Sequence, residues 1–200
     1  DIPRDRRTFV HRHPRRMSKH QCPMWLAHPT ALRLDPKTIQ ESQFLVEYGP
    51  RNDFIVNLSL HLKGNTLILF RYVEKHGQIL YDQLCDTNTD KDRRIFYVHG
   101  QTAREDREMI RTIMSQEDNA IINASVGVFS TGINIPELHN LVLANMMKGR
   151  VKVLQGIGRI LRKSEQSSRL FDIADDLRNG SHVNYSIRHA IVREDLYKQE

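Results

Sequence analysis

Apolar residues in this chain follow two patterns: short continuous runs, and longer segments in which they recur every three or four positions. A continuous apolar run between polar breaks indicates a strand buried on both faces, as in a parallel sheet. Five such runs occur, at residues 66–70, 94–98, 120–124, 140–144 and 169–174. Because segments with helical spacing separate them, the sequence predicts an α/β fold whose parallel sheet is covered by helices on both faces.

Helices are predicted from periodicity and from capping motifs. Residues 38–41 (T-I-Q-E) and 102–105 (T-A-R-E) have capping-box spacing, which predicts helices ending near Tyr48 and Met114. Further helices are expected over residues 74–84, 151–163 and 184–198, and from about Asn52, with Phe54, Ile55, Leu58 and Leu62 on one face. The C-terminal helix would dock through Ile187, Ala190, Ile191 and Leu196.

Three segments are predicted: a basic lead-in at residues 1–42, the α/β domain at 43–178 and a helical tail at 179–200. Residues 1–20 carry seven Lys or Arg against two Asp, and Thr8–Val10 has the composition of a short strand. This run is either a flexible solvated lead-in or an arm that contacts phosphates. Because the chain opens on Asp1 rather than Met, we expect it to be a piece of a longer protein.

Composition points to an anionic partner. The chain has 200 residues, 39% of them hydrophobic, a formal charge of +6 and a pI near 9.5, which favours nucleic acid over a membrane. No apolar run approaches the length of a membrane span, and no signal-peptide pattern occurs. Cys22 and Cys85 lie far apart, which suits a reducing compartment, and His11 and His13 lack a third ligand, so no metal site is expected.

The sharpest pattern in the chain is Q-x-x-G-R-x-x-R at residues 155–162. On a helix, Gln155, Arg159 and Arg162 fall at i, i+4 and i+7 and share one face. Two guanidinium groups and a carboxamide on a rigid helix suit a polyanion, because the planar fork of arginine matches phosphate oxygens. The alternative is a basic, solvated helix face.

A second candidate lies between the third and fourth predicted strands. Residues 125–136 combine two glycines, three hydroxyl side chains and a proline. Glycines let backbone N–H groups approach an anion, and Ser or Thr hydroxyls donate to phosphate. Because ligands gather at the carboxyl ends of parallel strands, this loop is favoured as a binding loop when it is combined with the Q-x-x-G-R-x-x-R helix.

These motifs resemble those of the second RecA-like domain of superfamily-two helicases, a parallel sheet of the P-loop NTPase type. Residues 125–136 resemble motif V, 155–162 motif VI, 66–71 motif IV, and 98–100 the strand-end motif that follows it. The sequence of residues 127–132 (G-V-F-S-T-G), together with His76-Gly77 in the helix after Phe70-Arg71, most resembles that of phage recombination helicases of the UvsW type. The resemblance covers about residues 43–176 and is loose over the first 40.

The resemblance implies roles on the nucleotide side. Arg159 and Arg162 would be arginine fingers that reach the γ-phosphate of ATP held by a partner domain, and Gln155 would orient them or the attacking water. Gly132 and Asn134 would line the nucleotide side of the cleft. Many relatives carry Asp where this chain has Asn134, which puts strong ribose or metal contacts there in doubt.

It also implies contacts with the DNA backbone, expected from Arg71, Gly100, Thr102, Ser125 and Thr131. The segment at 148–163 contains six basic residues and no acid, and Lys148 and Arg150 are expected to contact DNA at its near end. Such contacts hold phosphates without reading bases, so binding should depend on salt.

No G-x-x-x-x-G-K-[ST] motif occurs, and no Asp-Glu pair follows an apolar strand to hold Mg²⁺. The resemblance therefore implies an N-terminal RecA-like domain of the same protein that binds ATP and Mg²⁺, and the chain alone should not hydrolyse ATP.

The expected function is that of the second motor lobe of an ATP-dependent DNA helicase or translocase. Such a motor would remodel single-stranded or branched DNA in recombination, repair or replication restart, in the cytoplasm of a bacterial or phage-infected cell. Two alternatives stay open: a nucleic-acid-binding module with a decayed motor, and a motor of the same superfamily directed at RNA or acting as a restriction-type translocase.

Overall fold

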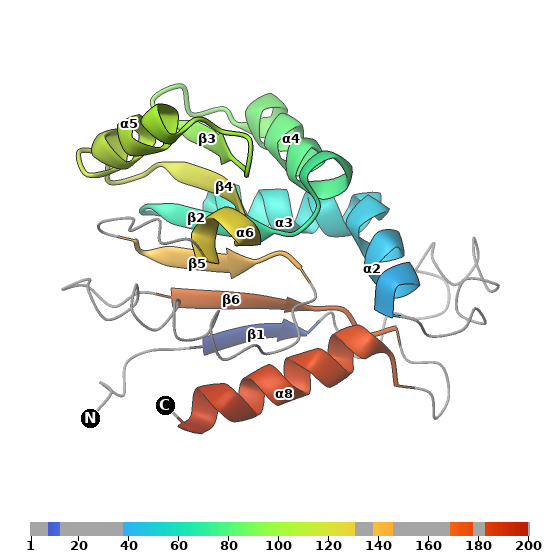
Figure 1. Cartoon of the computed structure of the whole chain (residues 1–200). Helices are drawn as coiled ribbons and strands as arrows, with labels where there is room; N and C mark the ends of the chain where they lie inside the picture. The colour runs from blue at the N-terminus through green and yellow to red at the C-terminus, as the bar shows by residue number, and fades with distance from the viewer. Residues whose placement is uncertain (1–7, 13–37, 131–137, 146–168, 178–182, 200) are drawn as a thin grey trace.

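The computed structural model describes residues 8–12, 38–130, 138–145, 169–177 and 183–199. Six parallel strands form one sheet in the order β1-β6-β5-β2-β4-β3, stacked in Figure 1 from β3 at the top to β1 at the bottom. The strands are β1 (Thr8–Arg12), β2 (Thr66–Phe70), β3 (Ile95–Val98), β4 (Ile121–Ser125), β5 (Asn140–Leu143) and β6 (Arg169–Ala174). All five predicted runs are strands, so the predicted parallel α/β sheet is confirmed.

β1 adds an edge strand from within the basic lead-in. It pairs with β6, from Thr8 opposite Leu170 to Arg12 opposite Ala174. The run Thr8–Val10 therefore does mark a strand, and this strand belongs to the sheet of the domain. The division of the chain at residues 42 and 178 stays a prediction, and the pairing of β1 with β6 crosses the first of these boundaries.

α2 (Thr38–Glu47) and α3 (Gly49–His61) match two predicted helices. α3 begins three residues earlier than expected, because Pro50 lies in its first turn, where the missing N–H costs no hydrogen bond. The predicted face packs on the core: Ile55 and Leu62 are buried, and the half-buried Phe54 and Leu58 pack against the same cluster. The predicted apolar face of this helix is therefore confirmed, and Val56 extends it.

The helix predicted over residues 74–84 consists of two elements. η1 (Val73–Gln78) is a π-helical turn, and α4 (Ile79–Thr87) continues from it. The wider turn is closed by a hydrogen bond from Gly77 N to Tyr72 O at 2.9 Å. Apolar spacing alone does not distinguish a π-helical turn from an α-helical one.

α5 (Arg104–Met114) follows β3, but the predicted capping box is wrong. The residue before the helix is Ala103, which has no side chain to cap it. The hydroxyl of Thr102 instead accepts a hydrogen bond from His99 N at 3.0 Å, within the turn itself. After β4, the chain enters a short helix, α6 (Val126–Ser130), where the sequence predicted a loop.

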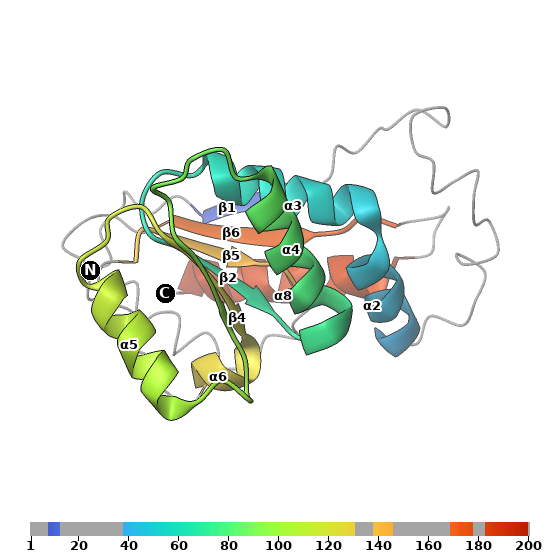
Figure 2. The same ribbon diagram turned by 90° about the horizontal axis from the view of Figure 1, so that it is seen from above.

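Two hydrophobic clusters pack on opposite faces of the sheet, as strand alternation requires. Ile68, Val142 and Phe171 pack with residues of α3 and α4. Leu67, Leu69 and Leu141 pack on the other face with Met114 of α5 and Val128 of α6. In Figure 2, α3 and α4 lie along one side of the sheet and α5 and α6 along the other. Helices on both faces are therefore confirmed.

The C-terminal helix α8 (Tyr185–Gln199) docks on β6 and α2. Ile187 and Ala190 are buried as predicted, but Ile191 is 47% exposed, so its predicted packing is wrong. Arg193 takes a buried position instead, where it forms a two-point ion pair with Asp172 of β6 at 2.6 and 2.7 Å. A charged residue therefore docks this helix where an apolar one was expected.

The amino-terminal edge of the sheet is held by buried polar side chains. Arg93 donates to Leu60 O and Leu62 O at the end of α3, both at 2.7 Å, and to Asn119 O at 3.0 Å. These bonds satisfy carbonyl groups that the helix end leaves free. No helix of the described ranges is long and apolar enough to cross a membrane.

Candidate nucleic-acid interface

Three neighbouring strands bring the candidate contacts of the described ranges to one edge of the sheet. β4 lies between β2 and β3, with Ser125 opposite Phe70 and Ala124 opposite Val98. Because all three strands run in the same direction, Arg71, Ser125 and the turn at 99–102 follow their carboxyl ends. This is the edge at which the sequence predicted a ligand.

Arg71 follows β2 directly and is exposed. Its guanidinium carbon lies 5.5 Å from the centre of the Tyr72 ring. The nearest basic neighbour in sequence, Lys75, lies 3.9 Å from Glu47, and both of those side chains are more than half exposed. Arg71 has no such carboxylate among the residues that the structure describes, so its charge is available to an anion.

The turn after β3 is fixed by its own hydrogen bonds. Thr102 N donates to His99 O, and His99 N donates to Thr102 Oγ1, both at 3.0 Å. Gly100 is exposed, and a Cβ on it would meet nothing within 4 Å. The turn thus presents backbone at the surface, but the first turn of α5 holds Glu105 and Asp106, which disfavour a phosphate at that helix end.

Ser125 ends β4, and only 7% of its surface is exposed. Three residues further on, the Val128 side chain of α6 is buried in the hydrophobic cluster on this face of the sheet, so α6 packs against the sheet. The strand end predicted for motif V therefore lies at the candidate edge, with little of the Ser125 side chain accessible.

Most of the other candidates lie outside the described residues. They come from the loop after α6, from the basic segment at 148–163 and from its Q-x-x-G-R-x-x-R motif: Thr131, Gly132, Asn134, Lys148, Arg150, Gln155, Arg159 and Arg162. Their predicted roles stay predictions. In sequence, residues 131–137 lie between β4 and β5, and residues 146–168 follow β5. The strands β4 and β5 lie on either side of β2.

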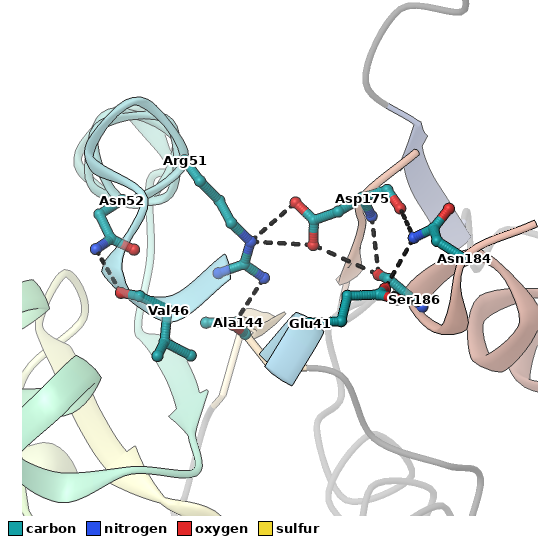
Figure 3. A network of polar contacts seen from close by, with 8 residues as sticks. All are labelled: Glu41, Val46, Arg51, Asn52, Ala144, Asp175, Asn184 and Ser186. Atoms are coloured by element: carbon teal, nitrogen blue, oxygen red, sulfur yellow. Dashed lines mark hydrogen bonds and ion pairs between the residues drawn. The ribbon is translucent and has the colours of Figure 1, made fainter. Parts of the chain in front are cut away.

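A buried polar network that the sequence did not predict joins α2, α3, α8 and the ends of β5 and β6 near the same edge (Figure 3). Arg51 Nε of α3 donates to both carboxylate oxygens of Asp175, at 2.9 and 3.0 Å, and Arg51 Nη2 donates to Ala144 O at 3.0 Å. The ends of β5 and β6 are thereby tied to α3. Neither residue belongs to a recognisable motif, and the only sequence signal is a charged residue directly after a buried strand.

The network continues into α2 and α8. The Glu41 carboxylate accepts hydrogen bonds from Tyr185 N at 2.9 Å and Ser186 N at 2.7 Å, at the start of α8. Asn184 Nδ2 donates to Glu41 Oε1 and to Asp175 O, both at 2.9 Å. Glu41 therefore caps the start of α8, where an anion is favoured by the helix dipole.

His76 of η1 is fully buried, and neither ring nitrogen has a hydrogen-bond partner. Burial, assisted by the positive charge of Arg51, lowers the pKa of His76 to about 3. The ring is therefore neutral at physiological pH. On the far side of η1, burial raises the pKa of Tyr97 to about 12, and its Oη donates to Val73 O at 2.9 Å. The His76 ring and the Tyr97 hydroxyl are therefore both uncharged at physiological pH, and neither adds charge to the candidate edge.

Comparison with known proteins agrees with this geometry. The helicase conserved C-terminal domain family matches residues 50–164. The ATP-dependent DNA helicase uvsW of Enterobacteria phage T4 is 34% identical over 184 residues, which cover 84% of this chain and 36% of that protein. The transcript termination protein A18 of Yaba-like disease virus is 25% identical over 132 residues, or 64% of this chain and 26% of that one.

Solved structures give the same result. The crystal structure of T4 UvsW superposes with a TM-score of 0.71 at 30% identity, over 85% of this chain and 36% of that chain. The C-terminal domain of the DEAD-box protein Dbp5 superposes with a TM-score of 0.59 at 15% identity, over 78% of this chain and 82% of that chain, which shows the fold alone. The chain thus spans about a third of the length of the phage helicase.

The RecA-like parallel sheet, the motif order and the family match over residues 50–164 together place this chain in the helicase conserved C-terminal domain family, among relatives of the phage UvsW helicase.

Proposed function

We propose that this chain is the second motor lobe of an ATP-dependent DNA helicase or translocase that remodels branched DNA. The observation that carries the proposal is Arg71, an exposed guanidinium at the carboxyl edge of a helicase-family sheet, without a carboxylate partner among the described residues. The phage relative that bears the name ATP-dependent DNA helicase supports the choice of DNA. Recombination, repair or replication restart is the proposed setting, in the cytoplasm of a bacterial or phage-infected cell.

On the DNA side, the lobe grips the phosphate backbone and does not read bases. Arg71 supplies charge, and the exposed Gly100 of the turn at 100–102 supplies a backbone N–H group. Because Glu105 and Asp106 occupy the first turn of α5, we assign the contact to this turn and not to the helix end. The other proposed contacts are Gly100, Thr102, Ser125, Thr131, Lys148 and Arg150.

On the nucleotide side, Arg159 and Arg162 act as arginine fingers and Gln155 orients them, while Gly132 and Asn134 line the cleft. ATP and Mg²⁺ are held mainly by an N-terminal RecA-like domain of the same protein, and ATP hydrolysis supplies the energy for stepping. A finger neutralises charge that develops on the transferred phosphoryl group, an effect worth about 10³- to 10⁵-fold in rate.

The test is ATP turnover by the protein that joins this chain to its ATP-binding domain, measured with and without DNA. We expect DNA to stimulate the wild type, and Arg159→Ala to reduce turnover by about a hundredfold or more. Arg111→Ala is the matched control, because Arg111 lies on α5 and, among the described residues, pairs with exposed Glu108. Wild-type turnover in Arg159→Ala would exclude the finger role.

Stimulation by different nucleic acids separates the alternatives. We expect single-stranded or branched DNA to stimulate turnover more than RNA of the same sequence. Stronger stimulation by RNA would redirect the proposal to an RNA motor. Binding of DNA without any turnover would make the lobe a nucleic-acid-binding module.

A further inference from the structure

In the described ranges, the guanidinium groups of Arg71, Arg169 and Arg188 each lie over an aromatic ring, and of these three Arg71 is the one that follows the carboxyl end of a strand. Arg51, Arg94, Arg111 and Arg193 each pair with a carboxylate. The guanidinium of Arg71 has no carboxylate partner in the described ranges and lies over the ring of Tyr72, 5.5 Å from its centre. A ring covers one face of a guanidinium and leaves the N–H groups, which lie in its plane, free to donate to an anion.

The backbone of Tyr72 is fixed by the π-helical turn. Tyr72 has an extended conformation, with φ −99° and ψ 120°, and directly precedes η1. Its carbonyl accepts the hydrogen bond from Gly77 N at 2.9 Å that closes this turn. The following carbonyl, Val73 O, accepts a hydrogen bond from Tyr97 Oη at 2.9 Å. Two hydrogen bonds therefore hold the carbonyl groups of Tyr72 and of the residue that follows it.

Gly77 itself is held from two further directions. Its carbonyl accepts a hydrogen bond from Asn123 Nδ2 of β4 at 2.7 Å. A Cβ on Gly77 would lie 2.4 Å from Phe70 Cε2, so the glycine rests against the ring of the last residue of β2. Both sequence neighbours of Arg71 therefore contact Gly77. Phe70 packs against it, and the Tyr72 carbonyl accepts its N–H.

We propose that Tyr72 is a positioning residue that holds the Arg71 guanidinium ready for a backbone phosphate of a nucleic-acid strand. The proposal rests on the proposed function, because it takes Arg71 as a phosphate contact. An arginine loses rotamer freedom when it binds, and contact with a fixed ring removes part of that freedom before the ligand arrives. The ring thereby strengthens a contact that it does not itself make.

A double-mutant cycle on the 200-residue chain tests this, with fluorescence anisotropy of a labelled oligothymidylate strand over a range of salt concentrations. We expect Arg71→Ala to weaken binding and to reduce the salt slope by about 0.7, the value for one phosphate contact on a single strand. Tyr72→Leu should weaken binding about two- to fivefold, as the loss of an exposed cation–π contact predicts, without changing the slope. In the Arg71→Ala background, Tyr72→Leu should have no further effect.

Tyr72→Phe is the conservative control, because it keeps the ring face, and it should bind like the wild type. Thermal unfolding of each variant checks the fold, and Tyr72→Met replaces Tyr72→Leu if the latter does not fold. Equal weakening by Tyr72→Leu in both backgrounds would overturn the positioning role and leave the Arg71 contact intact. Unchanged affinity and slope in Arg71→Ala would instead remove the Arg71 contact from the proposed function, and the positioning role with it.

Discussion

Arg51 of α3 and Asp175, the residue after β6, form an ion pair at 2.9 Å in which the side chains are only 2% and 4% exposed. The residues are 124 positions apart, and their pairing ties α3 to the far half of the sheet (Figure 3). Losing one partner leaves the other charged and buried, which is costlier than losing a surface pair.

We therefore expect Arg51→Met to lower the free energy of unfolding by about 3–5 kcal/mol. The matched control is Arg111→Met, which removes an exposed pair with Glu108 and should cost less than about 1 kcal/mol. Urea unfolding of both variants gives the comparison. Similar values for the two would mean that the Arg51 pair contributes no more than a surface contact.

Glu41 is expected to hold the first turn of α8. Gln in its place keeps one acceptor oxygen but loses the charge and the second acceptor, so Glu41→Gln should cost about 1–2 kcal/mol. Glu47→Gln lies on the same helix and is the control, because Glu47 is 57% exposed and its nearest partner is 3.9 Å away. Hydrogen exchange of the Tyr185 and Ser186 amides should rise in the first variant alone; unchanged protection would argue against the cap.

Stability should fall as the pH is lowered from about 6.5, because of His76. Its pKa is about 3 in the folded protein and near 6.5 in the unfolded chain, so between these values only the unfolded chain binds the proton. The free energy of unfolding should decrease by on the order of 1 kcal/mol per pH unit through this window, and no such loss occurs above it. Urea titrations at pH 8 and pH 5 measure the change.

His76→Leu removes the titrating ring and should flatten this dependence. Comparing the two proteins cancels the contributions of other titrating groups. An identical pH dependence in wild type and variant would show that His76 is not protonated preferentially in the unfolded chain.

Gly77→Ala should destabilise the domain by about 1–3 kcal/mol, the usual cost of overpacking, because the new methyl group would meet the Phe70 ring. Phe70→Leu in the same chain makes room and should recover part of the loss. Gly100→Ala is the control, since a Cβ there meets nothing within 4 Å. Thermal unfolding of the variants gives their melting temperatures. Equal losses for Gly77→Ala and Gly100→Ala would contradict the close contact between Gly77 and the Phe70 ring.

The sequence alone determined the strands, most helix positions and the edge at which Arg71, Ser125 and the turn at 99–102 meet. This was possible because burial on both faces of a strand demands a continuous apolar run, which is a local signal. The motifs of residues 125–136 and 155–162 also identified the family, since their spacing is local too. The capping box at residues 102–105 failed, because the Thr102 hydroxyl bonds the donor that the turn brings near it.

The tertiary structure alone decided which charges are buried and with whom they pair. No sequence pattern assigned a partner to Arg51, Asp175, Asp172 or Arg193, and all four are buried. The partners of each lie 21 or 124 residues away, so no periodicity records them. The same holds for the π-helical turn η1, because Gly77 lies against Phe70 of β2 and accepts a hydrogen bond from Asn123 of β4, the strand beside β2.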